Sequence, residues 1–105
     1  MQTPEIDVGD LADRLRDGAP LIDVREPDEW LEARVPGVPL IPLGEVVDRV
    51  SEFPTGETVY VICRSGGRSG QAVDYLRSVG VDAVNVAGGT LAWIEAGEPV
   101  DAGPA

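Results

Sequence analysis

One stretch, residues 58–70, most restricts how this chain can fold. β-branched and aromatic residues run from Thr58 to Ile62 and lead directly to Cys63, two arginines and two glycines follow, and a helical pattern begins near Ser69. This order predicts a strand, a tight loop and the start of a helix. The backbone N–H groups of such a loop and the positive end of the helix favour an anion at the centre. The cysteine sulfur itself can be that anion.

The other segments alternate between short apolar runs and patterns with helical spacing. That alternation is typical of an α/β fold, in which a mainly parallel sheet is covered by helices on both faces. Ligands of such sheets bind at the carboxyl ends of the strands, where Cys63 falls. We expect further strands at residues 5–6, 21–24 and 83–86, and helices at 8–18, 28–32, 46–53, 69–79 and 90–97.

Proline and aromatic positions predict several local details. Residues 35–43 hold three prolines and no charge, which predicts an extended segment with few ladder hydrogen bonds. Pro27 suits the first position of a short helix whose Trp30 and Leu31 face inward. Thr90 is the expected N-cap of the last helix.

Length and composition indicate one domain. The 105 residues are 43% hydrophobic, so we expect one domain over residues 1–100 and a loose tail over 101–105. The formal net charge is −11, and all eight basic residues are arginine. A field of that sign disfavours nucleic acid and anionic membranes as partners. The N-terminus lacks a basic, apolar leader and no apolar run reaches membrane-spanning length, so we expect a cytoplasmic protein.

The chain has one cysteine and no histidine. One cysteine cannot close an internal disulfide or build a cysteine-rich zinc site, and a metal would need carboxylates alone. The lack of histidine also excludes a cysteine–histidine protease. We therefore expect neither a metal nor another cofactor.

Cys63 by itself has an ordinary interpretation, because a lone cysteine at the end of an apolar strand is usually a small core residue. Paired glycines such as Gly66 and Gly67 most often just form a turn. The surroundings favour a reactive site instead. Residues 58–73 are the longest stretch without Asp or Glu in this acidic chain, and they contain two arginines.

A tight loop can supply the free energy that a reactive thiolate needs. A cysteine with a pKa of about 8.5 is only a few per cent ionised at neutral pH, and lowering that pKa by about two makes it mostly thiolate. The change corresponds to roughly 2.7 kcal/mol. A helix end contributes about 0.3–1 kcal/mol and each charge-assisted amide bond about 1.5–3 kcal/mol, so no general base is required.

Four motifs in this chain resemble those of the single-domain rhodanese family of sulfurtransferases, over about residues 6–100. Each motif alone is ordinary, whereas all four in this order are highly specific. The resemblance implies a rhodanese-like three-layer α/β fold with a five-stranded, mainly parallel sheet and helices on both faces. The motifs are Leu21-Ile22-Asp23-Val24-Arg25-Glu26-Pro27 with Glu29-Trp30, then Val35-Pro36-Gly37, then Cys63-Arg64-Ser65-Gly66-Gly67-Arg68-Ser69, and Gly88-Gly89-Thr90-Leu91-Ala92-Trp93 with Gly97 and Pro99-Val100.

The resemblance also implies a persulfide intermediate on Cys63. The Cys63 sulfur attacks the sulfane sulfur of a donor such as thiosulfate, sulfite leaves, and a thiol or cyanide removes the bound sulfur. A small-molecule persulfide or a persulfide on a sulfur-relay protein is an equally suitable donor.

The same resemblance suggests roles for the neighbouring residues. Arg64 is expected to point outward and attract an anionic donor. Arg68 is expected to turn back and brace the loop, with Asp23 or Glu26 as its carboxylate partner and Arg25 as a further support. Asp23 is interpreted equally well as a plain surface carboxylate. The amides expected to hold the thiolate or persulfide are those of Arg64, Ser65, Gly66, Gly67, Arg68 and Ser69.

Two positions depart from the family pattern. Ala33-Arg34-Val35-Pro36-Gly37 stands where the family commonly has Gly-His-Ile-Pro-Gly, and Leu40 stands where a polar residue is frequent. Because the lost histidine is not the nucleophile, the departures concern packing and acceptor access. Arg34 is expected to add positive charge at the rim of the site.

Two other functions remain open from the sequence. A related phosphatase or arsenate reductase needs a larger cradle, with five residues between cysteine and arginine. Here four residues separate Cys63 from Arg68, and Ser69 occupies the position where the larger loop would need its arginine. The second alternative is a non-catalytic binding or regulatory module, a class that usually lacks the cysteine that this chain retains, or a sulfur carrier that passes sulfur only to a dedicated protein partner.

Overall fold

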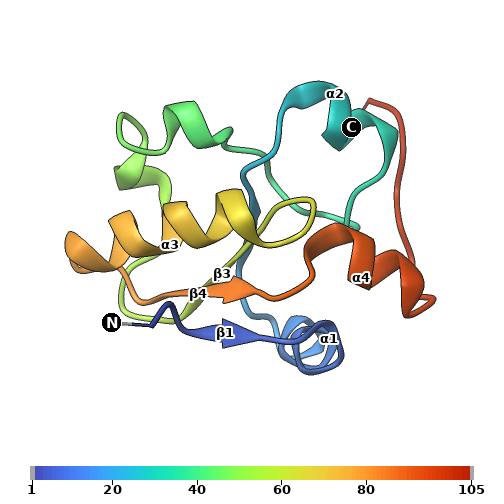
Figure 1. Ribbon diagram of the computed structural model, residues 1–105, viewed down its shortest axis with the longest axis horizontal. Coiled ribbons are helices and arrows are strands. Elements are labelled where there is room, and N and C mark those ends of the chain that lie inside the picture. Colours follow the sequence, from blue (N-terminus) through green and yellow to red (C-terminus); the bar gives the residue numbers. More distant parts are fainter. Residues whose placement is uncertain (1, 105) are drawn as a thin grey trace.

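A four-stranded parallel sheet organises residues 2–104, which are the residues that the computed structural model describes (Figure 1). The strands lie in the order β1-β4-β3-β2, and every neighbouring pair is parallel. The elements in chain order are β1 (Glu5–Ile6), α1 (Val8–Arg16), β2 (Leu21–Asp23), α2 (Pro27–Glu32), two 3₁₀ turns (Leu43–Glu45 and Val50–Glu52), β3 (Val59–Ile62), α3 (Gly67–Ser78), β4 (Ala83–Val86) and α4 (Gly89–Glu95).

The pleat of β3 separates two hydrophobic cores, one on each face of the sheet. Val59, Val61 and Cys63 belong to the core that packs against α3, whereas Tyr60 and Ile62 belong to the core that packs against α1 and α4. Figure 1 shows α3 above the strands and α1 below them. The three expected layers are therefore confirmed, and Cys63 lies on the α3 side at the carboxyl end of β3.

The sheet has four strands rather than the five expected. Residues 39–43 run beside β2, where a fifth strand would lie. Asp23 and Leu40 form an isolated parallel bridge, with hydrogen bonds from Asp23 N to Pro39 O and from Ile41 N to Asp23 O. Prolines lack the N–H that a ladder needs, so the segment stays extended and poorly laddered, as its composition predicted.

The helix expected at 46–53 is wrong. Residues 46–49 form a turn, which lies between two short 3₁₀ turns at Leu43–Glu45 and Val50–Glu52. The valines do not form the continuous apolar stripe that their spacing suggested. Val46 is 2% exposed, but Val47 is 59% exposed. β-branched residues without a shared buried face give little reason to extend a helix beyond one turn.

Two other local predictions are also wrong, the inward orientation of Leu31 and the N-cap position of Thr90. Leu31 is exposed rather than inward, because α2 is only six residues long and presents Trp30, not Leu31, to the core beside α1. Thr90 lies inside α4 rather than at its N-cap. That position belongs to Gly88, whose φ of +78° a glycine adopts without steric cost.

Residues 101–103, part of the tail expected to be loose at 101–105, are bonded to the rest of the domain. Asp101 and Arg34 exchange two backbone hydrogen bonds, and the Arg34 side chain donates to Gly103 O. Arg34 is 5% exposed and stacks 3.7 Å from the centre of the Trp30 ring, so it fastens the C-terminal segment and adds no rim charge. Ala105 lies outside the described residues.

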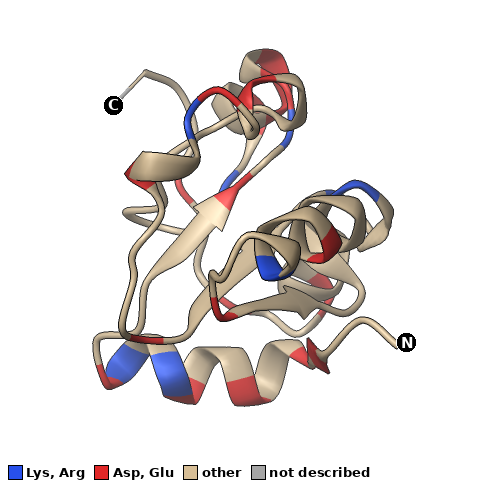
Figure 2. Cartoon of the chain, turned by 90° about the vertical axis from the view of Figure 1, so that its left-hand side faces the viewer, with Lys and Arg blue, Asp and Glu red and all other residues tan. Residues whose placement is uncertain are grey.

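The surface is acidic on several sides, with red residues on helices and turns around the molecule in Figure 2. Residues 58–73 contribute no acid to this surface. Among residues 2–104, no helix is long and apolar enough to cross a membrane.

Candidate active site

Cys63 sits between β3 and α3, at the start of a tight connection that we call the cysteine loop, residues 63–66. The helix begins at Gly67, two residues before the start that the sequence predicted. The alternation of β3 directs the Cys63 side chain toward α3, and only 1% of the residue is exposed. The sulfur is thus at the base of the loop, next to the N-terminus of a twelve-residue helix.

Two hydrogen-bond donors reach the Cys63 sulfur. Gly66 N lies 3.1 Å from Sγ, and Ser69 Oγ lies 3.2 Å from it. Gly66 has a φ of +112°, a backbone conformation that other residues adopt only with strain. A glycine is therefore required for the loop to turn this N–H inward.

The pKa of the Cys63 thiol is lowered from its ordinary value by the balance of two opposing influences. Burial is the largest single influence and raises the pKa, because it removes water from the thiolate. The Ser69 hydroxyl and the nearby backbone amides of Ser69, Gly66 and Ser65 lower the pKa, and together they outweigh burial. The site therefore favours a thiolate without any general base.

The carbonyls at the start of the cysteine loop are held on the opposite side by α4. Thr90 N and Thr90 Oγ1 both donate to Cys63 O at 2.9 Å, and Leu91 N donates to Arg64 O at 3.0 Å. In a trans peptide the C=O and the following N–H point in opposite directions. Fixing these carbonyls at α4 therefore turns the N–H groups of Arg64 and Ser65 away from it.

Gly89 allows this close approach of α4 to the loop. A Cβ atom on Gly89 would lie 2.6 Å from Cys63 O and from the Arg64 carbonyl group, and Gly89 has a φ of +58°. The Gly88-Gly89 pair, which opens the fourth motif of the sequence, is thus part of the site.

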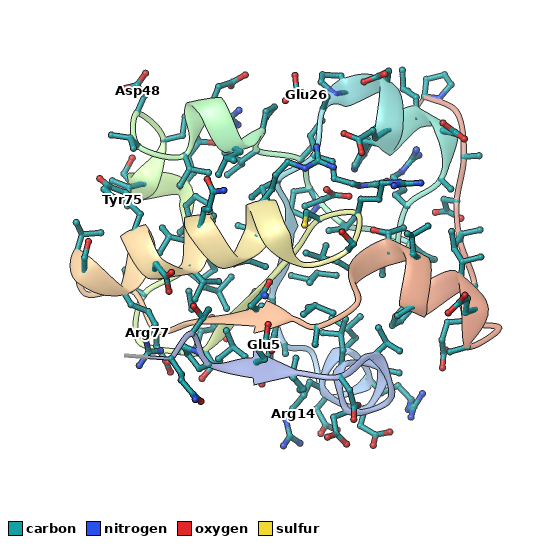
Figure 3. All side chains as sticks on the ribbon, viewed as in Figure 1. Glu5, Arg14, Glu26, Asp48, Tyr75 and Arg77 are labelled. Atoms are coloured by element: carbon teal, nitrogen blue, oxygen red, sulfur yellow. The ribbon has the colours of Figure 1, made fainter. Side chains whose placement is uncertain are left out.

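Arg68 braces the loop, but with a different partner from those predicted. Its two terminal nitrogens donate to the two carboxylate oxygens of Glu29 at 2.7 and 2.8 Å. Asp23 and Glu26 do not bond to Arg68, so both proposed partners are wrong. Glu26 is exposed at the start of α2, at the upper edge of Figure 3, and shares a capping box with Glu29.

The bidentate pair lowers the pKa of Glu29 from 4.5 to about 2, chiefly through the hydrogen bonds from Arg68. Those same bonds raise the already high pKa of Arg68. Because the pair is neutral overall, its main effect is to tie the N-terminal turn of α3 to α2.

Asp23 and Arg25 form a second, deeper ion pair at the end of β2. Arg25 donates to both Asp23 oxygens, with its closest contact at 2.8 Å, and to Ala33 O. Asp23 is 1% exposed and Arg25 is 5% exposed, so Asp23 is not a plain surface carboxylate. The pair fixes the strand beside β3 without a direct hydrogen bond to the loop.

A small cavity of about 150 Å³ opens beside the cysteine loop. Arg64 is exposed and lines this cavity, as predicted for an outward side chain. Larger hollows lie elsewhere and do not include loop residues. Among residues 2–104, no group of three or more potential metal ligands of the His, Cys, Asp and Glu types could hold an ion. The other residues that line the small cavity are Arg25, Glu29, Glu32, Ala33, Thr90, Leu91 and Ile94.

The sequence interpretation missed two residues of the site. Glu29 was matched to a motif without a role, although its capping-box spacing from Glu26 was visible. Asn85 is 1% exposed on β4 and donates from Nδ2 to Gly66 O at 3.0 Å. The only signal for Asn85 was an amide in an otherwise apolar strand, since a buried polar group needs partners.

Comparisons with known proteins agree on one family. The model of the family described as "Rhodanese-like domain" matches residues 7–96. A protein named "Sulfurtransferase" from Allochromatium vinosum is 39% identical over 99 residues, which cover 91% of this chain and 92% of that protein. The putative sulfur carrier protein YrkF of Bacillus subtilis is 42% identical over 74 residues, which cover 70% of this chain and 40% of YrkF.

Comparison with solved structures also finds rhodanese-related proteins. The crystal structure of a rhodanese-related protein from Thermoplasma volcanium superposes with a TM-score of 0.88 at 33% identity, covering 93% of this chain and 97% of that one. Its similarity confirms the α/β architecture with a parallel sheet and flanking helices.

Replacing Glu29 by Gln should destabilise the fold at neutral pH by about 1 kcal/mol, a value limited by the partial exposure of the pair. Because the folded-state pKa of Glu29 is below its unfolded value, the stabilisation is complete above pH 4.5 and is lost as the pH falls toward about 2. In urea unfolding, the wild-type protein should therefore have a higher free energy of unfolding than Glu29→Gln, and the difference should shrink only below pH 4.5. Glu32→Gln, an exposed change in the same helix, is the matched control, and a pH-independent advantage would contradict the assignment.

Replacing Gly89 by Ala should displace the cysteine loop and destabilise the fold by roughly 1–3 kcal/mol more than Gly97→Ala. Gly97 is the matched control because its φ is +78° but nothing lies within 4 Å of an added Cβ. The pKa of Cys63 should rise in Gly89→Ala only, measured from the pH dependence of thiol alkylation. Equal stability and equal pKa in the two variants would show that α4 does not hold the loop.

Proposed function

The chain belongs to the rhodanese-like domain family, and on that basis we propose that it is a sulfurtransferase acting through a persulfide on Cys63. The sulfane sulfur comes from a donor such as thiosulfate and goes to a thiol or to cyanide. The observation that carries this proposal is the convergence of Gly66 N and Ser69 Oγ on the Cys63 sulfur. The lowered pKa raises the fraction of Cys63 that is thiolate at a given pH, and the thiolate is the nucleophilic form.

In the loading step, the Cys63 thiolate attacks the outer sulfur of thiosulfate. The Sγ–S bond forms as the sulfur–sulfur bond of thiosulfate breaks, and sulfite leaves with the bonding electron pair. The charge is conserved, because one thiolate and one dianion give one persulfide anion and one dianion. No proton, metal or external oxidant is needed in this step.

The terminal sulfur of the persulfide then carries the negative charge. It lies one bond further out than Sγ, so the amides of the cysteine loop and the first turn of α3 are suited to hold it. In the unloading step cyanide attacks this sulfur, thiocyanate forms, and the bonding pair returns to Cys63 as thiolate. A thiolate acceptor reacts in the same way and leaves as a persulfide.

The burial of Cys63 limits what can react with it. With 1% of the residue exposed, a donor has to present a single narrow atom. The outer sulfur of thiosulfate or of a persulfide meets this condition. Exposed Arg64 at the neighbouring cavity can attract such anions despite the net charge of −11.

The geometry disfavours phosphoryl chemistry. A tetrahedral oxyanion needs a cationic side chain turned into the cradle, but both terminal nitrogens of Arg68 are bonded to Glu29. The loop is also one residue shorter than the phosphatase or arsenate reductase spacing. These two features support sulfur transfer over that alternative.

A partner-dedicated sulfur carrier is the second candidate function. The name of one relative, the putative sulfur carrier protein YrkF, favours it, and the chain corresponds to 40% of that protein. The same Cys63 persulfide would form, but it would be passed to a protein acceptor. The cytoplasmic location expected from the sequence stays a prediction.

The proposal predicts one added sulfur on the protein after incubation with thiosulfate, detected by intact mass, and thiocyanate when cyanide is then added. Cys63→Ser should abolish both signals, because the chain has no other cysteine. Arg14→Ala, an exposed change on α1, should retain both and is the control. Loading without transfer to cyanide or to small thiols would favour the dedicated carrier. Phosphate release from an aryl phosphate at a comparable rate, with no added sulfur, would overturn the proposal.

A further inference from the structure

The side-chain amide of Asn85 is buried behind Ser69, and its orientation is fixed by its neighbours. Nδ2 donates to Glu5 Oε2 at 2.8 Å and to Gly66 O at 3.0 Å. Figure 3 shows Glu5 on β1, the strand next to β4. Because both of these partners can only accept, the opposite orientation of the amide would set oxygen against oxygen twice. Oδ1 is therefore the atom that faces Ser69.

The Ser69 hydroxyl consequently faces two acceptors with one hydrogen. Ser69 Oγ lies 2.5 Å from Asn85 Oδ1 and 3.2 Å from Cys63 Sγ. Ser69 is 0% exposed and Asn85 is 1% exposed, so water does not stand in for a missing partner. Whichever acceptor loses the hydrogen is left with an unsatisfied contact, and such a contact is costly when buried.

The charge on Sγ decides which acceptor is satisfied. A neutral thiol can donate its own hydrogen to Ser69 Oγ, and the hydroxyl then donates to Asn85, so every group is paired. A bare thiolate has no hydrogen to give and competes with Asn85 for the hydroxyl. In a persulfide Sγ is again neutral, because the charge has moved to the outer sulfur, and the hydroxyl can stay with Asn85.

We propose that Asn85 is a positioning residue that holds the Ser69 hydroxyl hydrogen and thereby favours the thiol and the persulfide over the bare thiolate. The persulfide half of this inference rests on the proposed function, whereas the thiol half does not. In the reaction cycle Asn85 opposes the return to an unloaded anion and so raises the loaded fraction at a given donor concentration.

Other charged groups near Cys63 act on it independently of the hydroxyl. They are Arg68 on α3, paired with Glu29 of α2, and Arg64 in the loop, while Glu5 reaches the site only through Asn85. The Asp23–Arg25 pair closes the end of β2. None of these groups is bonded to the Ser69 hydroxyl. A comparison of Asn85→Ala with and without Ser69 therefore isolates the part of the Asn85 effect that acts through this hydroxyl.

The test is a double-mutant cycle on the pKa of Cys63, followed by ultraviolet thiolate absorbance, which reports a single thiol in a chain with one cysteine. Asn85→Ala should lower this pKa by about 1 in the protein with Ser69, since it frees the hydroxyl for the sulfur. The same change in a Ser69→Ala background should lower it much less. A merely structural role would loosen the Gly66 carbonyl, raise the pKa and do so in both backgrounds. An equal change in the two backgrounds, or a rise with Ser69 present, overturns the inference.

Glu5→Gln provides a second variant in case Asn85→Ala fails to fold. Glu5 is exposed on the edge strand, and its carboxylate polarises the Asn85 amide, so neutralising it weakens the hold on the hydroxyl. The pKa of Cys63 should fall by more with Ser69 present than in Ser69→Ala. Equal falls in both backgrounds would contradict the inference.

The loaded state is tested on the same variants by intact mass, with thiosulfate and sulfite at equal concentrations. Asn85→Ala should lower the equilibrium constant for loading by up to about tenfold, the counterpart of the expected change in pKa. A lowered pKa of Cys63 with an unchanged equilibrium constant for loading would overturn only the statement that Asn85 favours the persulfide. If the wild-type protein never gains a sulfur, the proposed function fails, while the pKa cycle still decides the role of Asn85.

Discussion

The peptide groups of the cysteine loop can stabilise a negative sulfur only while their carbonyls are held elsewhere. Thr90 and Leu91 hold the carbonyls of Cys63 and Arg64, and Asn85 holds that of Gly66. Each of these bonds comes from a segment distant in sequence. The anion site is thus a property of how α4 and β4 pack against the loop, rather than of the loop sequence alone.

Oriented amides replace a base in this site. The Arg68 charge is neutralised by Glu29 and the Arg25 charge by Asp23, so the field at the sulfur comes mainly from the Ser69 hydroxyl, the backbone dipoles and the end of α3. Dipoles do not titrate, which suits a chain without histidine. Their alignment does depend on rigid packing, and the two ion pairs supply it by fixing α2 and β2 beside the loop.

The sequence predicted the parts of the site that are local and missed those that depend on tertiary contacts. Cys63, the glycine turn and the helix start could be predicted because they follow one another along residues 58–70. Glu29 and Asn85 could not, because their partners lie 39 and 16 residues away. Asp23 and Arg25 were found, but as supports of Arg68 rather than as partners of each other.

The fold shows the same division between local and tertiary signals. The strands and the main helices were predicted from periodicity, whereas the prolines of residues 39–43 prevented a regular fifth strand. The prediction for Arg34 was wrong because its charge alone does not reveal that the side chain stacks on the Trp30 indole and donates to Gly103 O. These wrong predictions concern packing around the site and do not affect the prediction of the cysteine loop.

The central claim is that inward-facing amides hold the negative sulfur on Cys63, and the position of the transferred sulfur tests it most directly. A crystal structure of the protein after treatment with thiosulfate should show one extra sulfur bonded to Sγ, within hydrogen-bonding distance of amides in the cysteine loop and the first turn of α3. An extra sulfur that points away from these amides, toward apolar side chains or open solvent, would contradict the account.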